Sequence, residues 1–346
     1  MASAAAMLAG CAVWFLGVPA HDVPSQAASE EVAADDNVAT QPAVAVAAES
    51  PESPPSAKEG AAKSTLRAAA RTKSGDEEYC DPLSVTKWFI TEMSRVTKQT
   101  KPVAPTELFR QAKREKRCEL IRMPEPAERL SSEAIYARAK PGVVVVGAIL
   151  QPRGHKHFHA ALATGFVIGR NGVIATNFHV LEAFQHAKAV GVMTAERRVY
   201  PLKAVLAGDE PNDLAVVKIE AEDLTALPLA EHVSVGAPVW CLSHPALDTE
   251  ELETAFYAFT QGIVCGKYRL SVGGPNPIDV LAVTAEYAKG SSGGPILDER
   301  GAVVGIICQT RALFHDEDQT EPQLTWKFSR PVSSLRALLK TPADVK

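Results

Sequence analysis

The sequence predicts a mostly β protein of antiparallel barrels, with a helical N-terminal extension and a C-terminal helix. From Gly142 onward, short apolar runs alternate with turn residues such as Asn171-Gly172. These runs do not alternate regularly with helical segments. Short strands with frequent turns favour antiparallel barrels over a doubly wound parallel sheet.

Composition places the chain among ordinary soluble proteins. It has 346 residues, 46% of them hydrophobic, and a formal net charge of -5. That length is sufficient for two or more packed units. The negative charge argues against nucleic acid as the main partner. Six cysteines occur and none lies in a CxxC pair, which argues against a zinc ribbon or a thioredoxin-type site.

The first 75 residues divide into an apolar segment and a linker. Residues 1–20 carry no charged side chain, and Val18-Pro19-Ala20 suits signal-peptidase cleavage after Ala20. We therefore expect export to the periplasm or the medium, with an uncleaved membrane anchor or lipidation at Cys11 as alternatives. Residues 21–75 are rich in Ala, Glu, Ser and Pro, and they predict a disordered tether because they can bury little apolar surface.

Residues 76–130 predict a helical extension. Asp81-Pro82 is a suitable N-cap and first-turn pair, and we expect the apolar stripe that follows to be a packing surface. The stripe consists of Val85, Trp88, Phe89, Met93 and Val96. A second helix is expected from Thr106 to Ile121. Cys80 and Cys118 bracket the two helices, and a disulfide between them in an oxidising compartment remains open.

The remaining elements are expected in this order. Strands are predicted at Val143–Leu150, Gly165–Gly169, from Val173, Val199–Leu206, Leu214–Ile219, Val239–Leu242, Phe256–Val264, Ile278–Thr284 and Ala302–Cys308. Pro331–Leu339 is predicted to be a closing helix that packs on the last barrel.

The stretch Gly290-Ser291-Ser292-Gly293-Gly294-Pro295 concentrates small residues about one serine. An attacking hydroxyl must stand clear of its neighbours, while backbone N–H groups beside it point at the oxyanion that develops on the substrate. The N–H groups of Gly290 and Ser292 are spaced to share that oxyanion. Taken alone, the stretch fits a flexible Gly/Ser loop equally well.

A histidine and an aspartate accompany this serine. His179 lies at the end of a β-rich run, and Asp213 directly precedes the predicted strand Leu214–Ile219. The chain order is therefore His, Asp, Ser. In the triad with that order, the histidine takes the serine proton and a buried aspartate fixes the histidine tautomer.

On these residues, the segment from about Ser131 to Leu339 resembles a trypsin-fold serine protease of the Deg/HtrA type. The matching pieces are collinear: Ala163–Ile168, Thr176–Val180, Asn212–Val216, Leu227–Ala230, Val235–Pro238, Gln261–Val264 and Gly290–Pro295. The resemblance implies two antiparallel six-stranded barrels over residues 131–346 and no metal or organic cofactor. It also implies polypeptide substrates and a homo-oligomer.

The same resemblance assigns roles to individual residues. His179 is the implied general base, Asp213 its orienting carboxylate and Ser292 the nucleophile, with Gly290 and Ser292 forming the oxyanion hole. Two features depart from the family pattern. Ser291 stands where Asn or Asp is usual, and we expect a protease of this type without PDZ modules.

These observations predict a serine endopeptidase that works through an acyl-enzyme. The alternative is a catalytically dormant module of the same fold that binds peptides. The pattern G-x-S-x-G around Ser292 also fits α/β-hydrolases, but their triad histidine follows the serine in sequence, and only His315 does so here.

Three further residues are candidates for substrate binding. Glu286, six residues before Ser292, falls where this fold often has the floor of its primary specificity pocket. A carboxylate there would favour Lys or Arg in the substrate, although a solvent-facing Glu is equally consistent. Ile306 to Cys308 is the expected edge for pairing with an extended substrate.

The remaining histidines and cysteines predict structural roles. His155, His157 and His159 would share one face of a strand, but no obvious fourth ligand accompanies them, so we expect a polar hairpin tip and no metal site. Cys241, Cys265 and Cys308 lie in apolar strands and are expected to be buried core thiols.

Overall fold

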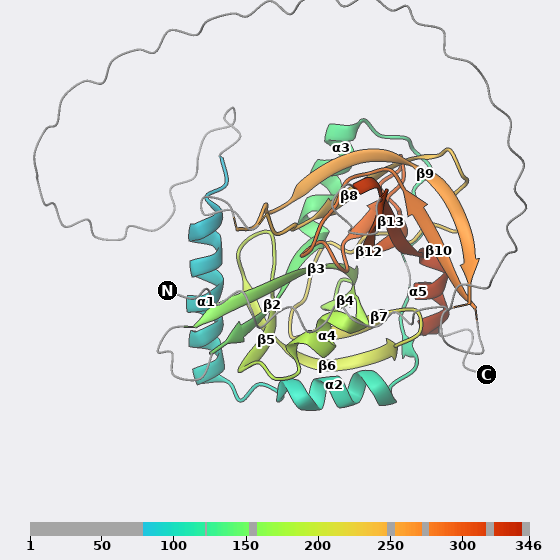
Figure 1. Ribbon diagram of the computed structural model, residues 1–346. Helices are drawn as coiled ribbons and strands as arrows, with labels where there is room; N and C mark the ends of the chain where they lie inside the picture. Colours follow the sequence, from blue (N-terminus) through green and yellow to red (C-terminus); the bar gives the residue numbers. More distant parts are fainter. Residues whose placement is uncertain are drawn as a thin grey trace, which may run out of the picture. The chain divides into compact units, whose positions relative to one another are not determined.

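Two closed barrels make up the body of the protein (Figure 1). The structure, a computed structural model, describes residues 79–121, 123–151, 158–247, 253–271, 277–315 and 322–340. The strand orders are β2-β3-β4-β7-β6-β5 in the first barrel and β10-β13-β12-β11-β8-β9 in the second. All pairs within the barrels are antiparallel. The predicted pair of six-stranded antiparallel barrels is therefore confirmed.

The elements have the following bounds. The first barrel consists of β2 (Val143–Leu150), β3 (His159–Gly169), β4 (Val173–Thr176), β5 (Ala189–Met193), β6 (Val199–Asp209) and β7 (Leu214–Ile219). The second consists of β8 (Pro238–Ser243), β9 (Ala258–Leu270), β10 (Ile278–Val283), β11 (Pro295–Leu297), β12 (Val303–Phe314) and β13 (Pro322–Pro331). The helices are α1 (Pro82–Gln99), α2 (Pro105–Arg114), α3 (Ser132–Ala139), α4 (Phe178–Phe184) and α5 (Val332–Leu338), with a 3-10 turn at Lys140–Gly142. A short strand β1 (Cys118–Glu119) pairs in parallel with β14 (Leu339–Lys340).

Helix α1 packs on the outside of the first barrel. Its N-cap is the predicted Asp81, whose carboxylate accepts the backbone N–H of Ser84 at 3.2 Å. Phe89 and Met93 are fully buried among side chains of β2 and β5. Val85 is buried with them, whereas Trp88 is 43% exposed and Val96 is half-buried. The predicted apolar stripe is thus a packing surface in part.

Helix α2 lies against β6 and ends earlier than predicted. A Cβ atom at Gly208 would lie 2.0 Å from the carbonyl oxygen of Ala112, so only glycine lets the helix backbone approach the strand this closely. The helix stops at Arg114 because Cys118 and Leu120 pack in the core between the barrels, with Cys118 in β1. Cys118 is a free buried thiol, as Cys80 is a free exposed one, so the disulfide between them is not formed.

A shared core joins the two barrels. Phe166 and Leu214 of the first barrel pack in one cluster with Trp240 and Ile306 of the second. Helices α3 and α5 complete this cluster, and the predicted closing helix is confirmed as α5. The chain segments that carry His179, Asp213 and Ser292 come from elements on both sides of this core.

Some sequence predictions fall outside the described residues. These include the signal peptide or anchor at 1–20, the linker at 21–75, and two of the three clustered histidines, His155 and His157. His159 is exposed at the start of β3. No helix among the described residues is long and apolar enough to cross a bilayer.

Candidate active site

His179 and Asp213 form a direct pair at one side of the first barrel. The ring Nδ1 of His179 lies 2.7 Å from Oδ2 of Asp213, and the backbone N–H of His179 donates to Oδ1 at 2.8 Å. His179 lies in the first turn of α4, not at the end of a strand as the sequence suggested. The helix forms there because it buries the apolar side chains around the histidine, Phe178, Val180, Leu181 and Phe184.

The backbone at Asp213 is held in an uncommon conformation. Asp213 has a φ of 52°, a left-handed value that Asp tolerates better than most residues. Its N–H donates to the carbonyl of Glu210 at 3.1 Å, and its own carbonyl accepts from Asn177 Nδ2 at 2.8 Å. This turn before β7 therefore fixes the direction in which the carboxylate points.

Cys308 also contacts the Asp213 carboxylate. Its thiol donates to Oδ2 at 3.0 Å, from a position where the register of β12 against β13 shifts between Ile307 and Gln309. The hydroxyl of Tyr287 lies at this shift, 2.8 Å from the carbonyl of Phe328 and 3.3 Å from that of Gln309. The β-bulge, braced by Tyr287, turns the Cys308 side chain toward the first barrel.

The surroundings of His179, Asp213 and Cys308 shift the pKa values of all three side chains. Burial acts to lower the pKa of His179, but the hydrogen bond and the negative charge of Asp213 outweigh it and raise that pKa above its ordinary value. Burial acts to raise the pKa of Asp213, but hydrogen bonds from His179 and Cys308 hold it below its usual value. Burial and the Asp213 charge raise the pKa of the Cys308 thiol, so the thiol stays protonated and remains a donor.

The serine-containing loop is clamped to the first barrel by Thr164 of β3. The Thr164 hydroxyl donates to the carbonyl of Gly290 at 2.9 Å, and its backbone N–H donates to the carbonyl of Ser292 at 2.9 Å. A Cβ atom at Gly293, where φ is 84°, would lie 2.2 Å from the carbonyl oxygen of Thr164. Glycine is therefore required where the two barrels meet.

Hydrogen bonds to the carbonyls of this loop set the directions of its N–H groups. The carbonyl of Lys289 accepts from the backbone N–H of Ala246 at 2.6 Å, and that of Ser291 accepts from Gly294 at 2.9 Å. In a planar trans peptide the following N–H points the opposite way, so those of Gly290 and Ser292 face away from these partners. Neither finds an acceptor among the described residues. Two free amide donors beside a serine can stabilise an oxyanion.

The two neighbouring serines have different surroundings. The Ser291 side chain is fully buried, and its hydroxyl accepts from Ser243 at 3.0 Å. Ser292 is partly exposed, and its hydroxyl makes no hydrogen bond within the described part of the chain. A bond from Ser292 to His179 is therefore not formed in this state, although such bonds are often long in ligand-free sites. Ser291 has a structural role in the loop, and Ser292 is the accessible hydroxyl.

The predicted substrate-binding residues lie in different settings. The Glu286 side chain is 75% exposed, and its carboxylate pairs with the buried Lys327 ammonium at 2.7 Å. Ile306 pairs with Pro295 on one side and Arg330 on the other. Ile306 therefore has no open edge for a substrate, which corrects that part of the prediction. Cys308 lies two residues after Ile306, where the pairing of β12 with β11 ends and such an edge begins.

Another buried histidine lies close behind the loop. His244 is fully buried, and burial lowers its pKa to about 3. Its Nδ1 accepts the backbone N–H of Tyr257 at 3.0 Å, and the backbone N–H of His244 donates to the Thr164 hydroxyl at 3.1 Å. His244 is therefore a neutral structural residue, and His179 is the histidine with an acidic partner.

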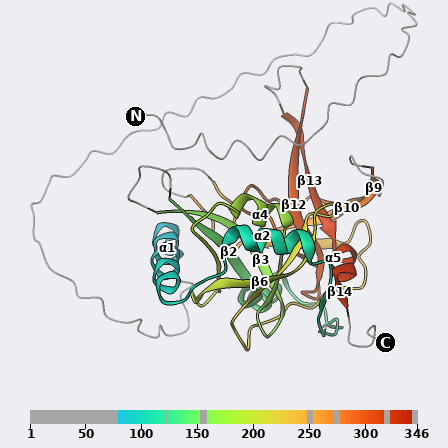
Figure 2. The same ribbon diagram turned by 90° about the horizontal axis from the view of Figure 1, so that it is seen from below.

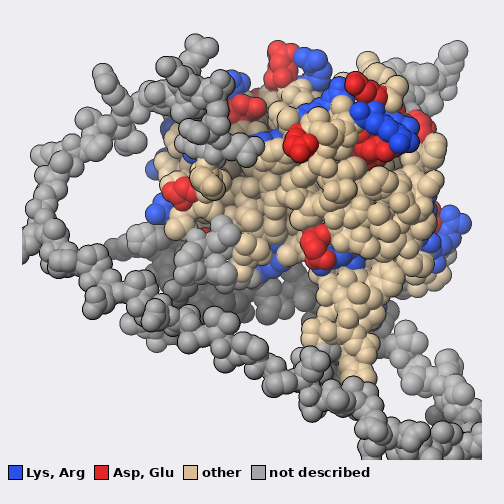
Figure 3. All heavy atoms as spheres, turned by 90° about the horizontal axis from the view of Figure 1, so that it is seen from above, with Lys and Arg blue, Asp and Glu red and all other residues tan. Residues whose placement is uncertain are grey.

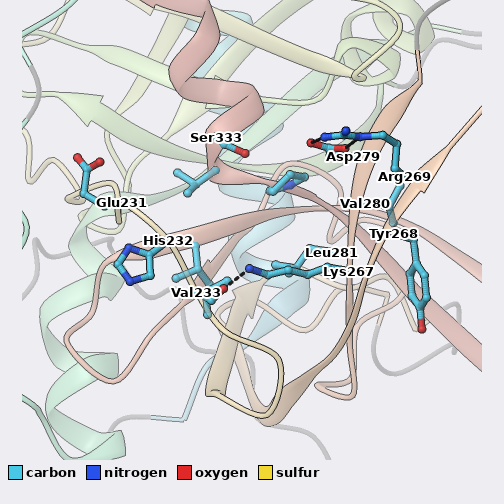
Figure 4. A pocket seen from close by; sticks show the side chains of 13 residues that line it. Glu231, His232, Val233, Lys267, Tyr268, Arg269, Asp279, Val280, Leu281 and Ser333 are labelled. Carbon is cyan, nitrogen blue, oxygen red and sulfur yellow. Dashed lines mark hydrogen bonds and ion pairs between the residues drawn. The ribbon is translucent and has the colours of Figure 1, made fainter.

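A separate pocket of about 440 Å³ opens on the second barrel (Figure 4). It lies beside the start of α5 and contains none of the predicted catalytic residues. Its charged side chains are engaged within the protein: Arg269 pairs with Asp279, and Lys267 donates to the carbonyl of Val233. The pocket is distinct from the candidate active site.

Part of the chain is similar to known peptidases. Residues 163–306 match the family model described as a trypsin-like peptidase domain. This segment therefore resembles a trypsin-like peptidase domain of the Deg/HtrA type. The chain is 33% identical over 146 residues to a probable periplasmic serine endoprotease, DegP-like, of Hahella chejuensis, a match covering 42% of this chain and 29% of that protein.

Other relatives show a similar extent of likeness. A putative serine protease HhoA of Synechocystis is 33% identical over 162 residues, covering 44% of this chain and 38% of that protein. Protease Do-like 1, chloroplastic, of Arabidopsis thaliana is 32% identical over 151 residues, covering 41% and 32%. The match thus spans about a third of the length of these curated relatives. Among solved structures, the HtrA-type protease AlgW with a tripeptide has a TM-score of 0.46 and 22% identity, covering 59% of this chain and 61% of that one.

Proposed function

We propose that the protein is a serine endopeptidase that hydrolyses polypeptides through an acyl-enzyme. In this proposal Ser292 is the nucleophile, His179 the general base and Asp213 the carboxylate that orients it. The N–H groups of Gly290 and Ser292 form the oxyanion hole. These residues and one water molecule are sufficient for the steps below.

The observation that carries the proposal is the combination of two features at the junction of the barrels. One is the 2.7 Å contact between His179 and Asp213. The other is the loop around Ser292, in which the N–H groups of Gly290 and Ser292 lack acceptors within the described residues while the carbonyls between them are held. A peptide-binding surface has no need of the first feature, and a structural loop would pair the donors of the second.

The proposed reaction follows from these positions. The Ser292 hydroxyl attacks the scissile carbonyl carbon while its proton passes to Nε2 of His179, and the negative charge on the carbonyl oxygen is stabilised by the two free N–H groups. His179 then gives the proton to the leaving amine as the C–N bond breaks, which leaves the acyl group on Ser292. Water, deprotonated by His179, hydrolyses that ester and restores the serine. Asp213 remains ionised throughout and stabilises the protonated ring.

Location and assembly belong to the same proposal. The names of the DegP-like relatives include the word periplasmic, which supports the export expected from the N-terminal sequence. A membrane tether through residues 1–20 and a homo-oligomer remain predictions of the sequence and of the resemblance.

The direct test is cleavage of an unfolded protein substrate, followed by mass spectrometry of the fragments. We expect internal cleavage by the wild-type protein and a loss of about 10⁴–10⁶-fold in kcat for Ser292→Ala and for His179→Ala. Ser291→Ala is the matched control, and it should retain cleavage because Ser291 is buried. Equal activity in the Ser292→Ala and wild-type proteins would exclude the proposal.

A dormant peptide-binding module is the second candidate. It is favoured by the missing hydrogen bond between Ser292 and His179 in this state. Binding of a peptide that is never cleaved, with equal affinity in wild type and Ser292→Ala, would support this candidate.

A further inference from the structure

Residues 244–247, which follow β8, lie directly behind the serine-containing loop. The backbone N–H of Ala246 donates to the carbonyl of Lys289 at 2.6 Å. That carbonyl and the N–H of Gly290 belong to one planar peptide, so the bond from Ala246 sets the direction of the N–H. A Cβ atom at Gly290 would lie 2.6 Å from the carbonyl oxygen of His244, so the two backbones are in contact. One of the two proposed oxyanion donors therefore depends on the position of residues 244–247.

The segment 253–257, which leads into β9, holds this stretch in place. The backbone N–H of Ala255 donates to the carbonyl of Pro245 at 2.8 Å. The N–H of Tyr257 donates to Nδ1 of His244 at 3.0 Å, and the two rings meet edge to face with their centres 4.6 Å apart. The two stretches therefore keep one relative position, because two hydrogen bonds and a ring contact join them.

Tyr257 has a backbone conformation that its surroundings must maintain. Its φ is 59°, a left-handed value that a large side chain rarely adopts. Such a conformation costs free energy and persists only where neighbouring groups fix it. Besides the bond to His244, the ammonium of Lys140 lies 5.5 Å from the centre of the Tyr257 ring, within the range of a cation–π interaction. The segment 253–257 is therefore held in a strained form by its contacts.

Phe256 connects this segment to helix α1. The centre of its ring lies 5.7 Å from that of His244, and its side chain packs against a buried cluster to which α1, β2 and β5 contribute. In Figure 1 the chain that leads into β9 passes close to the start of α1, and Figure 2 shows α1 on the side of the first barrel where β2 lies. We call this cluster the α1 cluster; its members from the helix are Val85, Phe89 and Met93.

These contacts with Phe256 are apolar. Figure 3 shows the molecule from above, the side on which α3 and β9 lie in Figure 1, and positive and negative side chains are interspersed on the part of this face that the structure describes. We therefore assign the connection to packing. Helix α1 also precedes residues 163–306, which match the family model, so the connection reaches outside the matched segment.

We propose that Phe256 is a positioning residue of the oxyanion hole and that α1 holds it in place. Phe256 packs between the α1 cluster and His244, which fixes residues 244–247. The bond from Ala246 to the Lys289 carbonyl then fixes the Gly290 N–H. This inference rests on the proposed peptidase function and adds to it a role for the N-terminal helical extension.

The test compares Phe256→Ala and Phe256→Leu with the wild type, as full chains, on a peptide that the wild type cleaves. Phe256→Ala removes the contacts of the ring, so the Gly290 N–H loses its fixed direction. We expect kcat to fall about ten-fold with KM nearly unchanged, which is part of the roughly 10²–10³-fold loss that removal of one oxyanion donor causes. Phe256→Leu fills much of the same space and should restore most of kcat.

A pair of inhibitors separates positioning from general loosening of the fold. A peptide aldehyde adds the Ser292 hydroxyl across its C=O bond, and the oxygen of the resulting hemiacetal occupies the oxyanion hole. The corresponding peptide alcohol binds without that step. In Phe256→Ala, affinity for the aldehyde should fall by the same factor as kcat, while affinity for the alcohol stays unchanged. Equal loss for both inhibitors, or unchanged kcat, overturns the inference.

The matched control is Phe259→Ala. Phe259 is also half-buried and lies three residues further along the chain, but its ring contact within the described residues is with Tyr136, at 5.4 Å. This variant should keep kcat and the affinity for the aldehyde near their wild-type values. A loss as large as that of Phe256→Ala would show that the effect is not specific to Phe256 and would reject its positioning role.

The double variant Phe89→Ala/Met93→Ala tests the part of α1. It removes two fully buried side chains from the α1 cluster, so Phe256 loses its support and kcat should fall with KM nearly unchanged. If this variant does not fold, the milder Phe89→Leu takes its place. Wild-type kcat in the folded variant rejects the role of α1.

Failure of the proposed function is recognised separately. Loss of cleavage in Ser292→Ala reports on the peptidase itself, whereas amide hydrogen exchange of the serine-containing loop needs no cleavage. The N–H groups of Ser291, Gly293 and Gly294 are hydrogen-bonded in this loop. They should exchange faster in Phe256→Ala than in the wild type and in Phe259→Ala. Equal exchange in Phe256→Ala and the wild type rejects the inference, even for an active peptidase.

Discussion

Thr164→Val removes the hydroxyl that links the two barrels at the Ser292 loop. Valine has the same shape as threonine, and the Thr164 side chain is fully buried, so the packing is nearly unchanged. Two bonds are lost: the hydroxyl no longer donates to the carbonyl of Gly290 at 2.9 Å and no longer accepts from the backbone N–H of His244 at 3.1 Å. The Gly290 carbonyl and the His244 backbone N–H then remain buried without a hydrogen-bond partner.

The expected cost follows from those two groups. Leaving one buried polar group unsatisfied costs about 1–3 kcal/mol, so two cost roughly 2–6 kcal/mol in the free energy of unfolding. The carbonyl of Gly290 also fixes the peptide that precedes Ser291. We therefore expect the loop to loosen and Ser292 to react more slowly.

Denaturant unfolding and the rate of labelling by a fluorophosphonate measure the two effects. Thr164→Ser is the control because it keeps the hydroxyl, and it should retain most of the wild-type stability and labelling rate. If Thr164→Val and Thr164→Ser unfold at the same denaturant concentration and label equally fast, the hydroxyl does not hold the loop and this reasoning is wrong.

Three other changes test the environment of the site. Because neutral His179 is the base and its pKa is raised, wild-type kcat/KM should rise with pH through a midpoint above about 6.5. Asp213→Asn should lower that midpoint and reduce the rate by about 10⁴-fold. A pH–rate profile in which the midpoint of Asp213→Asn is unshifted would contradict this. Cys308→Ala removes a hydrogen-bond donor from Asp213 and should raise the midpoint of the same pH–rate profile by a few tenths of a pH unit. Cys308→Ser supplies a stronger donor and should lower that midpoint. If the two variants shift the midpoint in the same direction, the thiol contact does not act on Asp213 as described. Glu286→Ala leaves the Lys327 ammonium, 9% exposed, without its partner. The free energy of unfolding should therefore fall by about 1 kcal/mol, a value discounted for the exposed carboxylate. In a peptide library, the predicted preference for Lys or Arg should disappear in this variant, and an unchanged preference would reject the role of Glu286 in specificity.

The barrels were predictable because most of their strands have a recognisable local sequence pattern. Apolar runs bounded by turn residues marked β2 and β7 with the bounds that the structure has, Val143–Leu150 and Leu214–Ile219. The predicted strands did not include β5, β11 or β13. β11 has only three residues, and it forms because neighbouring strands supply its hydrogen bonds, a tertiary effect that local propensity does not contain. In β13 polar residues alternate with Leu324, Trp326 and Phe328, which is a strand pattern that the prediction missed.

The candidate site was predictable only in part, for a related reason. Residue type and chain order pointed to His179 and Asp213, which the fold brings into contact. The contact of Cys308 with Asp213 joins residues 95 positions apart and depends on a bulge. The clamp from Thr164 to Gly290 spans 126 positions and exists only once both barrels have closed. No local pattern in the sequence carries such information.

Covalent labelling of the folded protein with a fluorophosphonate, followed by peptide mapping, decides whether Ser292 is an activated nucleophile. We expect a single adduct on Ser292 that disappears in Ser292→Ala and in His179→Ala and persists in Ser291→Ala. An adduct on Ser291, equal labelling of His179→Ala, or no adduct on protein that binds peptides would contradict the assignment of an activated serine.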